Sequence, residues 1–96
     1  MKRETLIKAI IKRYGEDTHI RTSEEFDGTP GGIWMSGENG DPYEKDGLSV
    51  FNYYGESKVY SFDAYGVHKN FCKFLEKAGW HSEWYDAGTI GLWKIN

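Results

Sequence analysis

The C-terminal third of the chain constrains the fold most, because a clear helical pattern there runs directly into a strand pattern. The apolar residues of segment 67–78 recur at helical spacing and form one stripe: Val67, Phe71, Phe74, Leu75 and Ala78. Gly79 follows at the position where a left-handed residue ends many helices, and the next residue, Trp80, is expected to pack back onto Leu75. The sequence therefore predicts a helix over residues 67–78 with Trp80 stapled to its last turn.

The residues after this helix predict a β-hairpin over 81–95. We expect a three-residue loop of Asp86, Ala87 and Gly88, since a two-residue turn would need positive φ at alanine as well as at glycine. This register pairs Trp84 with Ile90 and places both on one face with Leu92. The other face then carries His81, Glu83, Tyr85, Thr89, Gly91, Trp93 and Ile95.

The remaining segments complete an α+β pattern. Residues 5–14 carry a second helical stripe that ends at Gly15. Short strands are predicted at 18–22, 32–37, 48–54 and 58–62, the last three as a meander, while 23–32 is dense in turn formers and 38–47 is a loop. We expect a single domain over residues 1–96, with an antiparallel sheet of about five strands, two helices packed on one face, and the order α-β-β-β-α-β-β.

Charge is distributed unevenly along the chain. Residues 16–63 hold eleven acidic and three basic side chains, whereas residues 1–15 hold one acidic and five basic ones. An acidic block of this kind repels a phosphate backbone, so direct nucleic-acid binding is disfavoured, although a merely solvated polar face would have the same composition. Cys72 is the only cysteine, which excludes an internal disulfide. Charges interrupt the apolar residues near the N-terminus, so we expect neither a signal peptide nor a membrane segment, and a cytoplasmic location.

No set of residues predicts catalysis, a metal or a cofactor. His68 and Cys72 are spaced i and i+4 on the second helix, but no third residue or oxyanion donor accompanies them, so we interpret both as structural. The loop 38–47 offers oxygen ligands of the type that calcium takes without matching the EF-hand spacing, and we interpret it as a solvated loop. We therefore expect a protein that is not an enzyme.

Aromatic and acidic side chains supply the candidate binding surface. Aromatic residues make up 17% of the chain, more than a core of this size needs, so some of them are expected to be exposed. We expect an aromatic face made by Trp34, Tyr53, Tyr85 and Trp93 to contact a protein partner. The expected acidic contacts to a basic partner surface are Glu24, Glu25, Asp41, Glu44 and Asp46. The alternative is a small-ligand binding protein that stacks a nucleotide or sugar on the aromatic face, with a homodimer completing the site.

The segments GGIWMSGENG (31–40) and FLEKAGWHSEWYDAGTI (74–90) resemble small proteins carried by phages, prophages and other mobile elements. The resemblance covers roughly half the chain and implies no defined activity or site residue. It implies an expected type of function, because small acidic proteins of such elements often bind a host or phage protein and alter it. Anti-CRISPR and other anti-defence inhibitors that block a nucleic-acid-binding site are of this type.

Overall fold

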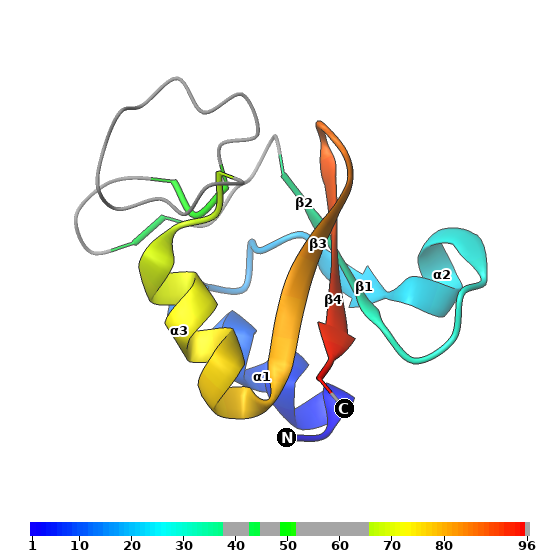
Figure 1. Ribbon diagram of the computed structural model, residues 1–96, viewed down its shortest axis with the longest axis horizontal. Coiled ribbons are helices and arrows are strands. Elements are labelled where there is room, and N and C mark those ends of the chain that lie inside the picture. The colour runs from blue at the N-terminus through cyan, green and yellow to red at the C-terminus, as the bar shows by residue number, and fades with distance from the viewer. Residues whose placement is uncertain (38–42, 45–48, 52–65, 96) are drawn as a thin grey trace.

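A four-stranded antiparallel sheet organises the described residues, which are 1–37, 43–44, 49–51 and 66–95 of a computed structural model (Figure 1). The strands are β1 (Ile20–Thr22), β2 (Ile33–Ser36), β3 (Trp80–Asp86) and β4 (Thr89–Lys94), arranged in the order β1-β2-β4-β3. Three helices accompany them: α1 (Arg3–Tyr14), α2 (Ser23–Asp27) and α3 (Lys69–Ala78). The α+β class is as predicted, whereas the order of the described elements is α-β-α-β-α-β-β.

The predicted meander of strands 32–37, 48–54 and 58–62 is wrong in its first pairing, that of 32–37 with 48–54. β2 has β1 on one side and β4 on the other, so both of its hydrogen-bonding edges are occupied. Within the described part of 48–54, Ser49 forms an isolated bridge to Tyr43, and Phe51 forms one to Val67. The predicted strand 58–62 lies outside the described residues.

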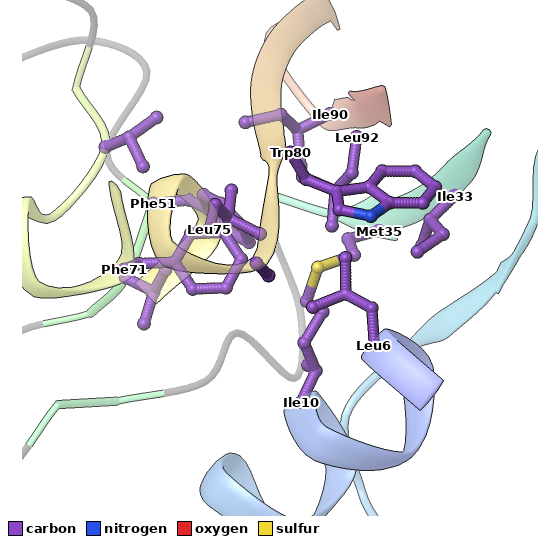
Figure 2. Close-up of a cluster of buried hydrophobic side chains, with 13 residues drawn as sticks. Leu6, Ile10, Ile33, Met35, Phe51, Phe71, Leu75, Trp80, Ile90 and Leu92 are labelled. Carbon is purple, nitrogen blue, oxygen red and sulfur yellow. The ribbon is translucent and has the colours of Figure 1, made fainter. Parts of the chain in front are cut away.

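One face of the sheet forms the hydrophobic core with two helices. Ile33 and Met35 of β2 pair with Leu92 and Ile90 of β4, and all four are fully buried. Buried residues of α1 and α3 join them in one cluster, namely Leu6, Ile10, Phe71, Leu75 and Ala78 (Figure 2). The prediction that two helices pack on the same sheet face is therefore confirmed for α1 and α3.

The junction between α3 and β3 follows the predicted helix ending. Gly79 adopts the left-handed conformation (φ 81°, ψ 30°), and its N–H group donates to the carbonyl oxygens of Leu75 and Glu76. Trp80 is only 1% exposed and lies in the core cluster that Figure 2 draws. Its indole Nε1–H donates to the carbonyl oxygen of Met1 at 2.8 Å, so the buried indole keeps a hydrogen-bond partner.

The hairpin between β3 and β4 has a shorter turn than predicted. Trp84 pairs with Ile90 as expected, but Thr89 pairs with Asp86 and not with Tyr85, because a β-bulge lies between Trp84 and Asp86. The turn residues are Ala87 and Gly88, and neither has positive φ. An Asp86 carboxylate oxygen accepts from the Gly88 N–H at 2.9 Å, a local bond that favours turns and needs no left-handed residue.

Helix α2 replaces part of the segment 23–32 that was predicted as turns. Thr22 caps it with a reciprocal pair of hydrogen bonds: its side-chain oxygen accepts from the Glu25 N–H, and the Glu25 carboxylate accepts from the Thr22 N–H. Gly28 ends the helix in the left-handed conformation. These capping bonds satisfy terminal backbone groups that a helix of only five residues cannot satisfy within itself.

A buried carboxylate joins α1, α3 and the segment 43–44. The Glu44 side chain is 3% exposed, and it lies 3.2 Å from Arg13 Nη2. It also accepts hydrogen bonds from the Tyr14 hydroxyl and, at 3.4 Å, from Asn70 Nδ2. Burial alone would raise the pKa of Glu44, but the bonds from Tyr14 and Arg13 outweigh it and hold that pKa below its ordinary 4.5. Burial, together with the bond to Glu44, raises the pKa of Tyr14.

We predict that Glu44→Gln lowers the free energy of unfolding at pH 7 by about 1–3 kcal/mol, because charge-assisted hydrogen bonds are lost while solvent partly screens Arg13. A depressed folded-state pKa contributes stability above the unfolded pKa and loses it as pH falls. The difference in unfolding free energy between wild type and variant should therefore become smaller below pH 4.5. Urea denaturation at several pH values measures it. Glu16→Gln, the same change at an exposed site, should have no such effect, and a gap independent of pH would contradict this assignment.

Candidate functional site

The sheet face opposite α1 and α3 carries a pocket of about 260 Å³. We call it the outer pocket. Its lining comes from α2, β2, β3 and β4. It includes five aromatic residues and two carboxylates, namely Phe26, Trp34, Trp84, Tyr85, Trp93, Asp27 and Glu83. Figure 1 shows α2 on the side of the sheet away from α3, so this short helix forms one wall of the outer pocket. The outer face is therefore partly covered by α2.

Strand register brings the floor of the outer pocket together. Trp34 of β2 is paired with Gly91 of β4, and Gly91 is paired with Glu83 of β3, so the three residues form one row across the sheet. Side chains directly opposite each other in antiparallel strands share a face. Because Gly91 has no side chain, the middle of this row leaves room for the Trp93 indole.

The Trp93 indole lies flat across two glycines. A Cβ atom added to Gly32 would come within 2.4 Å of Trp93 Cζ3, and one added to Gly91 would come within 2.8 Å of Trp93 Nε1. One face of the ring is thus pressed on the backbone at both positions. The sheet can hold the indole this closely only because both positions lack a side chain. The other face of the ring is directed away from the sheet, toward the outer pocket.

Phe26 of α2 connects the helix to the aromatic residues of the sheet. Its ring stacks on Trp34 with a centroid distance of 5.4 Å and an interplanar angle of 18°. It also meets Tyr85 edge-on at 5.4 Å. Phe26 is 37% exposed and Tyr85 66% exposed. Two large aromatic side chains at the rim of the pocket are therefore available to a binding partner.

Trp34 forms a cation–π contact with Arg21, and its indole N–H has no acceptor among the described residues. Its cross-strand partner Arg21 holds its guanidinium carbon 5.1 Å from the centroid of an indole ring, within the range of a cation–π contact. The Trp34 Nε1–H is buried and has no hydrogen-bond acceptor among the described residues.

The charge of the outer pocket is negative. Asp27 and Glu83 are both exposed carboxylates, and no lysine, arginine or histidine is among the described residues of the lining. Hydrogen bonds from Thr29, including one from its N–H to Asp27 Oδ1 at 2.9 Å, lower the pKa of Asp27. The Glu83 carboxylate makes no hydrogen bond or ion pair with any described residue. A ligand with positive charge would therefore meet two carboxylates that carry no competing ion pair within the described chain.

The structure brings together three of the four aromatic residues proposed from the sequence. Trp34, Tyr85 and Trp93 all line the outer pocket. Tyr53 lies outside the described residues. Sequence reasoning missed Phe26 and Asp27, because it treated residues 23–32 as turns, although the Thr22-x-x-Glu25 pattern was a signal for the helix that carries them.

Of the acidic residues proposed from the sequence, the three that the structure describes do not form one exposed surface. Glu24 is paired with Arg3 at 2.7 Å and accepts from the Gly31 N–H, while Glu25 belongs to the cap of α2. Glu44 is buried against Arg13 and is unsuited to an exposed contact. Asp41 and Asp46 lie outside the described residues. The carboxylates beside the aromatic side chains are instead Asp27 and Glu83.

His68 and Cys72 keep their structural interpretation. His68 is 2% exposed and caps α3, with its Nδ1 accepting from the Asn70 N–H at 3.1 Å. The predicted helix start at residue 67 is also corrected, because His68 precedes the first helical residue, Lys69.

The parts of the chain that the structure describes contain neither a metal-binding cluster nor a membrane-spanning helix. No three His, Cys, Asp or Glu side chains in these ranges meet in a way that would hold a metal ion. Within the same ranges, every helix is too short or too polar to cross a lipid bilayer.

We predict that Trp80→Ala and Trp93→Ala differ in their effect on stability. Trp80→Ala empties a fully enclosed core position and should cost about 3–5 kcal/mol of unfolding free energy. Trp93→Ala removes a half-buried ring from the outer face and should cost about 1–2 kcal/mol. Urea denaturation followed by far-UV circular dichroism compares the two variants without relying on tryptophan fluorescence. An equally severe loss for Trp93→Ala would mean that its indole is a core residue.

Comparisons of the chain with protein-family models, curated proteins and solved structures found no significant match.

Proposed function

We propose that this protein is a non-enzymatic binding module that docks its outer pocket on a basic surface of a protein partner and so inhibits or regulates that partner. The observation that carries the proposal is the composition of the pocket: five aromatic residues and two carboxylates, with no basic residue among the described residues that line it. Aromatic side chains in a partly enclosed site supply most of the binding free energy in many protein interfaces. Carboxylates favour a basic partner and raise the rate of association with it.

The size of the outer pocket favours a protein side chain over a nucleotide or sugar. Pockets that bury small molecules usually measure about 300–1,000 Å³, and this one measures about 260 Å³. Asp27 and Glu83 would also repel the phosphate groups of a nucleotide. A single side chain from a partner fits both the volume and the charge, while Phe26 and Tyr85 at the rim would contact the surrounding surface.

The acidic segment 16–63 supports steering toward a basic partner. It carries a net charge of −8, from eleven acidic and three basic side chains. A charge of this size attracts a positive surface over about a Debye length, roughly 8–10 Å at physiological salt. The resemblance of residues 31–40 and 74–90 to phage and mobile-element proteins suggests a partner that binds nucleic acid in the host cytoplasm, whose basic site the module would occupy, as anti-CRISPR and other anti-defence inhibitors do.

Affinity capture with a matched pair of tyrosine variants tests the proposal. Tyr85 and Tyr43 are each 66% exposed, but only Tyr85 lines the outer pocket. We predict that Tyr85→Ser reduces capture of the partner by tenfold or more, because its ring is part of the aromatic contact, while Tyr43→Ser leaves capture unchanged. Quantitative mass spectrometry of proteins retained by the tagged chain measures both. Sedimentation velocity on the same variants reports the oligomeric state.

Two outcomes would contradict this proposal. Equal capture by wild type and Tyr85→Ser would place the contact elsewhere on the molecule. A change from dimer to monomer in Tyr85→Ser would make a second copy of the chain the occupant of the outer face.

A further inference from the structure

We infer that the outer pocket holds the guanidinium group of an arginine side chain from the partner. This inference rests on the proposed function and adds the chemical identity of the group that the pocket recognises. A guanidinium is planar, always charged, stacks on aromatic faces and binds carboxylates through two parallel hydrogen bonds. The outer pocket offers both kinds of contact within one cavity.

The aromatic contact comes from the free face of Trp93. Because this indole lies flat over Gly32 and Gly91, its other face forms a fixed platform directed away from the sheet. Tyr85 stands at the neighbouring edge, held edge-on against Phe26. A planar cation lying parallel to the Trp93 ring would meet the negative face of its π system.

The carboxylate contact comes from Glu83 and Asp27. Glu83 pairs with Gly91 across the sheet and has no partner among the described residues, so its oxygens remain available to a cation. Asp27 approaches from α2 and accepts from the Thr29 N–H through one oxygen. Two carboxylates without a lysine or arginine in the lining leave a positive charge to be supplied from outside.

The protein already uses this chemistry once on the same sheet face. Arg21 places its guanidinium over the Trp34 ring at 5.1 Å, although Arg21 does not line the outer pocket. The same geometry, a guanidinium lying over an indole, is therefore available to an arginine of the partner over Trp93.

Titration with short peptides tests the inference on the intact chain. The probes are acetyl-Gly-Arg-Gly-amide and the same peptide with citrulline, which keeps the shape of arginine and loses the charge, or with lysine. Binding is followed by the indole N–H signals in ¹H–¹⁵N NMR spectra, in which the core residue Trp80 serves as an internal reference. We expect the Trp93 signal to move with the arginine peptide, with an affinity at least tenfold higher than for citrulline and higher than for lysine.

Matched glutamate variants complete the test. Glu83→Gln should weaken binding of the arginine peptide by about tenfold, whereas Glu76→Gln, an equally conservative change at an exposed position of α3, should have no effect. No shift with arginine, equal binding of citrulline, or an unchanged affinity in Glu83→Gln would each overturn the inference. Equal binding of lysine would overturn the choice of a guanidinium. Any of these results, together with loss of partner capture in Tyr85→Ser, would leave the proposed function standing without the arginine.

Discussion

The pairing of β2 with β4 is the interaction on which both faces of this protein depend. Ile33 and Met35 meet Leu92 and Ile90 on the core face, and the residues between them meet on the other face. Because successive side chains of a strand alternate between faces, the register that buries the aliphatic residues also aligns Trp34 with Gly91. The core and the outer pocket are therefore two consequences of one set of backbone hydrogen bonds.

The local features of the fold could be predicted from the sequence because each has a local physical cause. The helical stripe of α3, the left-handed Gly79 and the placement of Trp84 with Ile90 and Leu92 follow from spacing and from glycine chemistry. The length of the hairpin loop was predicted wrongly, and the cause of this error is also local. The prediction considered only the φ angles of the turn, whereas the side chain of Asp86 forms the turn and a bulge absorbs the change in register.

The contacts between distant segments could not be predicted in this way. Nothing in the residues around Trp34 indicates that its neighbour on one side is β4, more than fifty positions later in the chain. The same limit applies to charge. The sequence analysis placed Glu83 on the face of Tyr85 and Trp93, where the structure also has it, but it listed Glu44 as an exposed acidic contact, whereas the fold buries Glu44 against Arg13. Which carboxylate stabilises the fold and which is free to bind depends on tertiary position, not on composition.

The two glycines beneath Trp93 have a consequence for how this protein can change during evolution. Most positions on an exposed sheet face tolerate many side chains, but Gly32 and Gly91 cannot gain even a methyl group without displacing the indole. The shape of the outer pocket is thereby linked to two positions that carry no side chain. Drift at either glycine would reshape the outer face while leaving the hydrophobic core intact. Variants of this protein that keep both glycines should therefore differ mainly at the rim, where Phe26 and Tyr85 can be exchanged to suit a different surface.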